Sequence, residues 1–343
     1  MDRMRFGRTE LMVSKLALGG IPLMRLPKED GVAIVREALD LGINFIDTAR
    51  AYTDSEEKIG EAIRGIPREE LVLSSKSIAQ TPAELSDHLD TSLSLLGVDY
   101  VDIFHLHSIS SQERYDNAFK EGGNLEWLQE QVKLGKVRFP AFSSHTVDLA
   151  LKIMQTNQFD VVQLPLNFID LEAEKAVGLA RELDMGFISM KPMGGGRIDK
   201  AEPAFHYLMQ YDNIVPDPGI ESLEQIREIV AIVEAGERLN EADEAYIVKL
   251  RAETGATWCH RCDYCQPCSQ GILISSALIV ESTFGRFNSQ GAHWLVDGAV
   301  AAARSCTQCG DCLPRCPYHL DIPTLLKENI AVYDRIVKEE SVA

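Results

Sequence analysis

Short apolar runs and amphipathic, helix-like segments alternate along the first 240 residues of the chain. Runs rich in β-branched and aromatic residues predict strands at 16–20, 45–49, 71–75, 101–107, 137–143, 161–167, 186–192 and 214–220. Helical patterns lie between them, for example at 30–41, 82–96, 147–155 and 223–235. Strands separated by single helices form right-handed crossovers and pair in parallel. The pattern therefore predicts an α/β fold, a closed (β/α)8 TIM barrel, and the segment 3–11 around Gly7 predicts a hairpin before it.

The composition is that of a globular protein with a large core, 45% hydrophobic and 25% charged. At 343 residues the chain exceeds a barrel of about 250 residues and leaves room for an appendage. A net charge of −18 argues against nucleic acid and anionic membranes as partners. The first residues carry charges with no apolar stretch behind them, and no run approaches the length of a bilayer span. We therefore expect neither a signal peptide nor a membrane segment.

All eight cysteines lie between Cys259 and Cys316, so the first 258 residues contain none. This segregation indicates that the thiols serve one local structure, and it marks a domain boundary near 240–255. We predict a barrel in 1–240, a cysteine domain in 241–325 and a C-terminal helix or tail in 326–343. Thiols in a chain without a secretion signal indicate a reducing, oxygen-poor cytoplasm.

Ionisable residues follow successive predicted strands at the end where a TIM barrel carries its active site. Asp47 ends the second strand, Lys76 the third and His107 the fourth, and Tyr52 lies on the loop after Asp47. Singly, each has an ordinary structural explanation, as a helix cap, a solvated lysine or a core histidine. Their joint occurrence at consecutive strand ends favours a catalytic group.

The stretch 44–60, which reads NFIDTARAYTDSEEKIG, resembles the signature of the aldo-keto reductase superfamily. The resemblance implies that Tyr52 donates a proton to a substrate oxygen, with Lys76, Asp47 and His107 in support. Reducing a carbonyl needs hydride at carbon and a proton at oxygen, and an ammonium beside a phenol helps it to act near neutrality. His105 lies two residues before His107 on the same strand face, either as a deeper lumen residue, which we favour, or as a pocket member.

The same resemblance implies a nicotinamide site further along the barrel. Its cofactor-binding positions are Ser143, Ser144, Gln163, Met190, Pro192, Gly194, Gly219 and Gln225. Ser143 and Gln163 correspond to residues that hold the nicotinamide carboxamide, with Ser144 or His145 where the family has Asn. Met190 stands where the family often stacks a Tyr, and 190–196 resembles the loop around the diphosphate.

The predicted adenosine end departs from the pattern of NADPH-dependent members, which place Lys or Arg there for the 2′-phosphate. This chain has Glu221 and Glu224, with Arg227 as the only nearby cation and Ile229 in place of an Asn that touches adenine. Two carboxylates repel a phosphate unless a distant Arg compensates, so NADH is easier to accommodate than NADPH. The polar segment 108–124 either shapes substrate specificity, as such loops do in the family, or is a solvated insertion.

Two cysteine runs carry the strongest signal in the sequence. The first, C-x2-C-x2-C-x2-C, comprises Cys259, Cys262, Cys265 and Cys268. The second, C-x2-C-x2-C-x3-C-P, comprises Cys306, Cys309, Cys312 and Cys316. The second run matches the pattern of bacterial two-cluster ferredoxins, and the first departs from it in its last step and lacks the proline. We predict two [4Fe-4S] clusters, and by analogy Cys316 joins the first three cysteines while Cys268 joins Cys306, Cys309 and Cys312. Zinc, which favours two separated C-x2-C pairs, and disulfides are weaker alternatives.

The cysteine domain is expected to be mostly helical, and the whole chain resembles a subgroup of aldo-keto reductases with a C-terminal 4Fe-4S domain. Three functions remain open. The first is an NADH- or NADPH-dependent oxidoreductase acting on a small carbonyl or alcohol, with clusters that exchange electrons with a ferredoxin or another electron-transfer protein. The second is an electron-transfer protein on a barrel scaffold that uses a flavin or a protein donor. The third keeps the enzyme and makes the clusters structural.

Overall fold

The structure, a computed structural model, describes residues 1–254, 258–259, 261, 263–285, 287, 289–316 and 318–341. The chain divides into two compact units, Met1–Glu244 and Ala245–Ala343. No helix in the described part of the chain is long and apolar enough to cross a membrane. Each unit is described by itself below.

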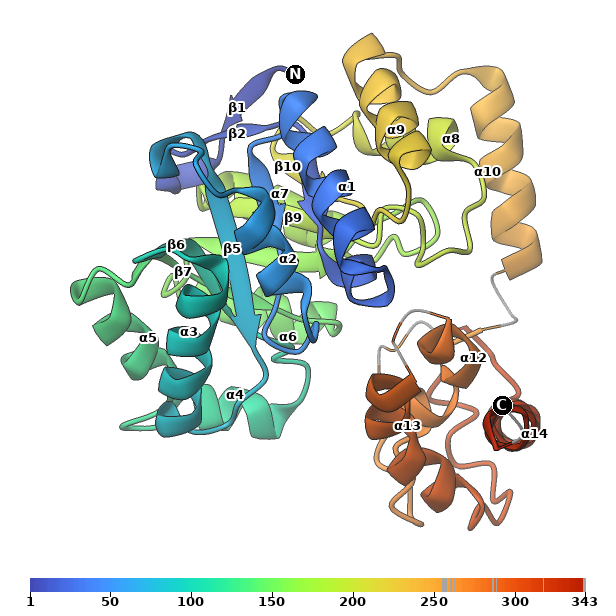
Figure 1. Cartoon of the computed structure of the whole chain (residues 1–343). Helices are drawn as coiled ribbons and strands as arrows, with labels where there is room; N and C mark the ends of the chain where they lie inside the picture. Colours follow the sequence, from blue (N-terminus) through green and yellow to red (C-terminus); the bar gives the residue numbers. More distant parts are fainter. Residues whose placement is uncertain are drawn as a thin grey trace. The chain divides into compact units, whose positions relative to one another are not determined.

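The first unit is the predicted (β/α)8 barrel (Figure 1). Its parallel strands are β3 Ala17–Gly19, β4 Phe45–Asp47, β5 Val72–Ser77, β6 Val101–Leu106, β7 Val137–Ser143, β8 Val161–Pro165, β9 Gly186–Met190 and β10 Ile214–Asp217. A parallel bridge between Gly19 and Gly219 closes the sheet on itself. A Cβ on Gly19 would lie 2.7 Å from the carbonyl oxygen of Pro218, so this closure requires glycine.

Helices lie between consecutive strands on the outside of the barrel. They are α1 Lys28–Asp40, α2 Ser55–Ala62, α3 Pro82–Leu96, α4 Gln112–Phe119, α5 Asn124–Lys133, α6 Val147–Gln155, α7 Glu174–Glu182, α8 Ala201–Leu208 and α9 Leu223–Ala235. Local sequence sets their ends, most completely in α3. There the Thr81 side chain and Glu84 form a capping box, Pro82 occupies the first turn, and Gly97 ends the helix at φ 69°.

One strand differs from the expectation, and one segment gains detail. The polar stretch 108–124, whose role the sequence leaves open, contains α4, which Ser111 caps by accepting from the Arg114 amide. The third barrel strand continues past the expected end at Ser75, so Lys76 lies inside β5, opposite His105 of β6. The Lys76 side chain is 1% exposed and faces the barrel interior.

A hairpin closes the bottom of the barrel. Strands β1 Arg3–Arg5 and β2 Met12–Ser14 pair antiparallel around a short 3-10 turn. The side chains of Phe6, Leu11 and Val13 pack with an apolar layer that the barrel strands contribute: Ala17, Phe45, Val72, Ile103, Ala141, Val161, Ile188 and Val215. Two residues further along several strands the lumen becomes polar, because alternate residues face the same side of a strand.

The second unit contains helices and no strand among its described residues. They are the end of α10 Glu241–Thr254, then α11 Ile274–Ala277, α12 Val280–Phe284, α13 Ser289–Ala303 and α14 Ile322–Glu340. One core cluster packs Cys259, Cys265 and Cys316 with Ile272 and Leu326, among others. A second joins the described parts of α12, α13 and α14 through Val280, Val296 and Val300.

Candidate active site

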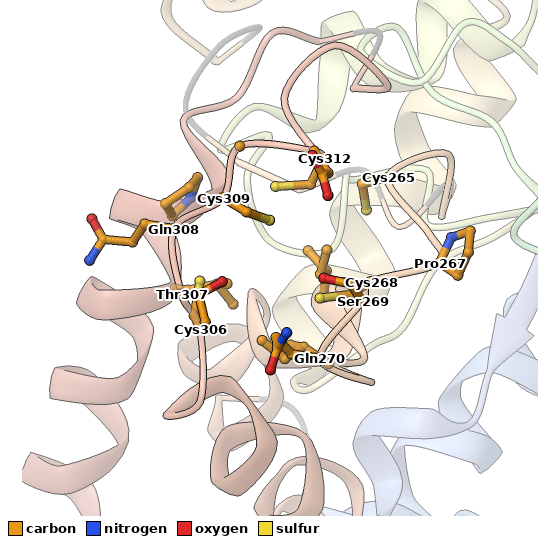
Figure 2. Close-up of a pocket in the computed structure, with 16 residues that line it drawn as sticks. Cys265, Pro267, Cys268, Ser269, Gln270, Cys306, Thr307, Gln308, Cys309 and Cys312 are labelled. Carbon is orange, nitrogen blue, oxygen red and sulfur yellow. The ribbon is translucent and has the colours of Figure 1, made fainter.

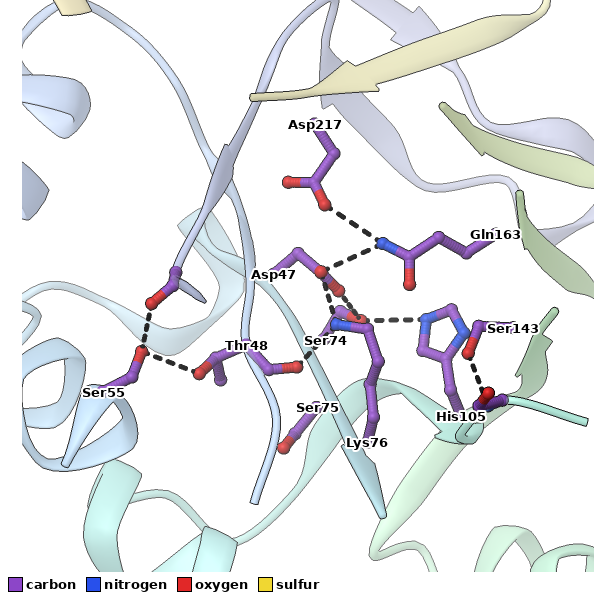
Figure 3. Close-up of polar contacts among 12 residues, drawn as sticks. Asp47, Thr48, Ser55, Ser74, Ser75, Lys76, His105, Ser143, Gln163 and Asp217 are labelled. Atoms are coloured by element: carbon purple, nitrogen blue, oxygen red, sulfur yellow. Dashed lines mark hydrogen bonds and ion pairs between the residues drawn. The ribbon is translucent and has the colours of Figure 1, made fainter. Parts of the chain in front are cut away.

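Two residues of the predicted tetrad, Asp47 and Lys76, come together at the C-terminal ends of adjacent strands (Figure 3). Asp47 ends β4, and Lys76 reaches it from β5, with side chains only 3% and 1% exposed. The Lys76 ammonium donates to Asp47 Oδ2 and, at 2.7 Å, to the carbonyl oxygen of Thr48. Two acceptors at the end of the neighbouring strand β4 therefore stabilise the positive charge of Lys76.

Three side chains donate to Asp47. Besides Lys76, the Ser74 hydroxyl donates to Oδ1 at 2.7 Å and the Gln163 amide donates to Oδ2 at 3.1 Å. Burial alone would raise the pKa of Asp47, but the positive charge of Lys76 and these hydrogen bonds keep it below its usual value. The aspartate therefore stays ionised, and burial of Lys76 is likewise outweighed by Asp47, so the pKa of Lys76 is raised.

Tyr52 lies in the turn between β4 and α2, with the Lys76 nitrogen 5.4 Å from its ring centre. Its ring meets the His107 ring edge to face at 6.2 Å and 84°. Among the described residues, its hydroxyl has no hydrogen-bond partner. Burial raises the pKa of Tyr52 to about 12, which outweighs the lowering by Lys76. The pKa of Tyr52 is therefore not shifted towards neutrality as expected. Tyr52 is protonated at neutral pH and can donate its proton.

His105, in β6, and His107, just after its end, are both neutral. Burial and the nearby Lys76 lower the pKa of His105 and of His107 to about 3. His105 is fully buried in the lumen, where its Nε2 lies 3.0 Å from the Ser74 hydroxyl. Because Ser74 gives its one proton to Asp47, His105 Nε2 is the donor in this contact. His107 is the histidine whose ring contacts Tyr52.

The predicted nicotinamide-binding residues lie at the ends of β7 and β8. The Ser143 hydroxyl accepts from the Ser108 amide at 2.8 Å, and Ser144 is fully buried and hydrogen-bonds within the turn to Thr146. Gln163 is 2% exposed and its Nε2 is used by carboxyl groups, but its Oε1 has no partner in the described part of the chain. The structure therefore leaves Gln163 Oε1 as an acceptor for a ligand and uses Ser144 locally.

Beyond β9 the chain turns tightly. Met190 ends the strand, Pro192 follows it, and Gly194 closes a turn at φ 56° with its amide on Lys191 O at 2.8 Å. At the end of β10, Gly219 is exposed, and a Cβ there would lie 2.7 Å from Pro22 Cγ. Gly219 therefore leaves backbone accessible at the end of β10, whereas Pro192 and Gly194 are buried.

The adenosine end contains a cation that the sequence did not reveal. Arg227 is held by Glu37 at 2.7 Å, whereas Arg25 from the segment Ile21–Arg25 forms an ion pair with Glu221. Arg25 is therefore the distant arginine that the sequence left open, and chain folding places it against Glu221. Gln225 accepts from the Glu221 amide at 2.8 Å, which fixes the start of α9.

Two lumen groups were not singled out from the sequence. Ser74 links His105 to Asp47, and Asp217, at the end of β10, accepts from Gln163 at 3.0 Å. Asp217 follows the apolar run at 214–216 just as Asp47 follows 45–46. The strand-end rule that selected Asp47 would have selected Asp217 as well.

The second unit gathers cysteines around a cavity (Figure 2). Its lining thiols are Cys265, Cys268, Cys306, Cys309 and Cys312. Burial raises the pKa of Cys312, and charges on Cys309, Cys306 and Cys268 add to the rise, so these four thiols are neighbours. In the same way Cys316 contributes to the raised pKa of Cys259.

Cys262 lies outside the described residues, so the structure describes only Cys259, Cys265 and Cys316 of the first predicted ligand set. Among the described residues, no three Cys, His, Asp or Glu side chains lie where they could hold one metal ion. Thiols that surround a cavity lined also by Pro267 and Gly310 fit a multi-iron group, whose ligands sit around its periphery.

The sequence profile of the Aldo/keto reductase family matches residues 15–204, more than half of the chain. The chain belongs to the aldo/keto reductase family. The profile of the 4Fe-4S dicluster domain matches residues 258–321, which contain all eight cysteines. The suspected combination of an aldo/keto reductase barrel with a C-terminal 4Fe-4S domain is therefore confirmed.

Two relatives are similar to this chain over a little more than half of its length. L-galactose dehydrogenase of Arabidopsis thaliana is 28% identical over 58% of this chain and 68% of its own length. NADH-specific methylglyoxal reductase of Escherichia coli is 25% identical over 51% of this chain and 61% of its own. The chain thus spans about two thirds or less of the lengths of these aldo/keto reductases.

Solved structures show the same fold. An aldo-keto reductase from Bacillus halodurans in its holo form has a TM-score of 0.64 and 22% identity, covering 73% of this chain and 96% of that one. An aldo-keto reductase from Klebsiella pneumoniae in complex with NADPH has a TM-score of 0.61 and 21% identity, covering 73% and 95%. These similarities establish the fold of this aldo/keto reductase.

Proposed function

We propose that the barrel of this aldo/keto reductase interconverts a small carbonyl compound and its alcohol with a nicotinamide cofactor. The observation that carries the proposal is the Tyr52 hydroxyl, which lies without a hydrogen-bond partner among the described residues, beside Lys76 and the ring of His107. A protonated phenol at this position can donate to a substrate oxygen. The neutral His107 can orient that oxygen.

NAD(P)H, when bound, supplies the hydride that reaches the carbonyl carbon. Tyr52 supplies the proton that completes the alcohol, and the charge left on its oxygen is stabilised by Lys76, which Asp47 holds charged and in place. The free Oε1 of Gln163 suits the carboxamide of the nicotinamide, and the exposed backbone at Gly219 suits close approach of the cofactor. Oxidation of the alcohol runs the same proton transfer in reverse.

The test of this role is Tyr52→Phe in the full-length protein. We expect kcat to fall about 100- to 10,000-fold, because only the proton donor is lost, while NADH affinity is unchanged. Tyr100→Phe is the matched control, since Tyr100 lies just before β6 under the Arg68 guanidinium, away from the tetrad. Equal activity of Tyr52→Phe and the control would refute the proposal.

We propose that NADH is preferred over NADPH. The carboxylate of Glu221 is paired with Arg25, and Arg227 is already paired with Glu37, so a 2′-phosphate would have to displace a carboxylate to gain a cation. In Glu221→Gln we expect NADPH affinity to rise about tenfold relative to NADH, measured by titration of both cofactors. Glu202→Gln, in α8, controls for net charge. A wild-type preference for NADPH would contradict this choice.

We propose that the second unit holds two [4Fe-4S] clusters. Cys268, Cys306, Cys309 and Cys312 would hold one, and Cys259, Cys262, Cys265 and Cys316 the other; the neighbouring thiols described above support this division. Such clusters pass single electrons, so the partner would be a ferredoxin or another electron-transfer protein.

Anaerobic iron and sulfide analysis tests this directly, with about eight irons expected per chain. Bleaching of the visible absorption by NADH would connect the barrel and the clusters electronically, through a bound flavin if one is found. Eight irons without bleaching would leave the clusters structural or reserved for another donor. About four irons or fewer would contradict two clusters.

A further inference from the structure

One ionisable group in the barrel lumen has no role in the proposed proton transfer. It is the carboxyl of Asp217, the last residue of β10, whose side chain is 8% exposed. Its Oδ2 accepts from Gln163 Nε2 at 3.0 Å. Its Oδ1 is buried, and no donor of the described residues reaches it. A protonated Asp217 can share a hydrogen bond with the neighbouring carboxyl of Asp47. A buried acid beside an ionised carboxylate calls for an explanation.

Gln163 connects Asp217 to the tetrad (Figure 3). Its amide nitrogen donates to Asp47 Oδ2 at 3.1 Å and to Asp217 Oδ2 at 3.0 Å. An amide nitrogen has two protons, so both are used. The Oε1 of Gln163 must then point away from the two carboxyl groups, and no described residue donates to it.

The two carboxyl groups differ in their affinity for a proton. Asp47 is ionised because Lys76 pairs with it. Burial, and then the charge of Asp47, raise the pKa of Asp217 well above its usual range, and a hydrogen bond with Asp47 adds to the rise. The charged groups that face it are Asp47 from β4 and Lys76 from β5, while the neighbouring strands offer Gly19 and Met190.

We infer that Asp217 is a positioning residue that fixes the amide of Gln163, so that Oε1 accepts a hydrogen bond from the nicotinamide carboxamide. The inference rests on the proposed nicotinamide-dependent function. With Asp47 as its only anchor, the amide would keep one unused proton and could rotate. With both anchors, both amide protons are used, so rotation of the amide would break two hydrogen bonds instead of one.

Asp217→Leu in the full-length, cluster-containing protein removes the second anchor. We expect NADH to bind about tenfold more weakly, the effect of one lost hydrogen bond to a buried group. Binding of ADP-ribose, which lacks the nicotinamide, should be unchanged. This difference between the two ligands separates positioning of the carboxamide from general damage to the site.

Asp217→Asn supplies a second variant that keeps the shape and an acceptor for Gln163. We expect its NADH affinity to equal that of the wild type at pH 7.

The outcomes are distinguishable. A wild-type chain that binds neither NADH nor NADPH refutes the proposed function, and the inference with it. Normal wild-type binding together with an unaffected Asp217→Leu variant refutes the inference alone. So does an equal loss of NADH and ADP-ribose binding in folded Asp217→Leu, or a tenfold loss of NADH affinity in Asp217→Asn.

Discussion

The barrel site and the cysteine unit differ in how their buried polar groups are stabilised. In the barrel, Asp47 has three donors from β5 and β8, and its counterion Lys76 is as buried as it is. In the second unit, Cys259, Cys265 and Cys316 are themselves part of the core, and other thiols line a cavity. The barrel chain therefore supplies the counterion and the donors for its buried carboxylate, whereas the second unit presents thiols whose partner must come from outside the chain.

This difference bears on stability. A buried ion pair contributes little by comparison with apolar packing, but removing one partner leaves an uncompensated charge. A ligand that binds only the folded state contributes its binding free energy to folding. We therefore expect the barrel to be sensitive to single side chains of its network, and the second unit to be sensitive to the loss of its clusters.

The largest effect is expected from Cys306→Ser. Removing one thiol from the group around the cavity should cost one cluster, about four irons, and with it the packing of α11 Ile274–Ala277 and its neighbours. Iron and sulfide analysis and hydrogen exchange measure both. NADH binding by the barrel should persist. Ser305→Ala is the control, and an unchanged iron content in Cys306→Ser would contradict the assignment of that thiol as a ligand.

A smaller but still large effect is expected from Lys76→Met. It leaves the Asp47 carboxylate buried without its counterion, which should lower the free energy of unfolding of the barrel by about 3–5 kcal/mol. Denaturant unfolding followed by a barrel signal measures this. Adding Asp47→Asn should restore part of the loss, because the uncompensated charge is gone. Full stability of Lys76→Met would show that the pair is not as isolated from water as its burial indicates.

The smallest effect is expected from Thr81→Ala. Loss of the capping box at the start of α3 should lower barrel stability by about 1 kcal/mol, without changing iron content. Thr91→Ala, which removes a hydroxyl bonded to Asp87 O inside the same helix, is the control. A shift in the control as large as in Thr81→Ala would point to helix propensity rather than to the cap.

Much of this architecture was predictable because it depends on local patterns. Alternating strands and helices indicated the barrel, and Asp47, Lys76 and His107 stand at strand ends that a single rule identifies. The spacing of the cysteines indicated the 4Fe-4S domain that the family profile confirms.

What the sequence could not supply depends on tertiary packing. The pKa of Tyr52 rises because the folded chain excludes water from it, an effect that the charge of Lys76 does not overcome. The pairing of Arg25 with Glu221 joins segments from the two ends of the barrel sequence. Neither fact can be read from a local pattern. The Arg25–Glu221 pair forms only where strands β3 and β10 meet, and Tyr52 is buried only where loops cover the lumen.

The hairpin of β1 and β2 has a kinetic consequence. With Phe6, Leu11 and Val13 filling the floor, the lumen opens at one end only. Under the proposed function, both reactants must use that opening. The two then share one route in and out, and turnover is paced in part by how quickly the product and the spent nicotinamide clear it.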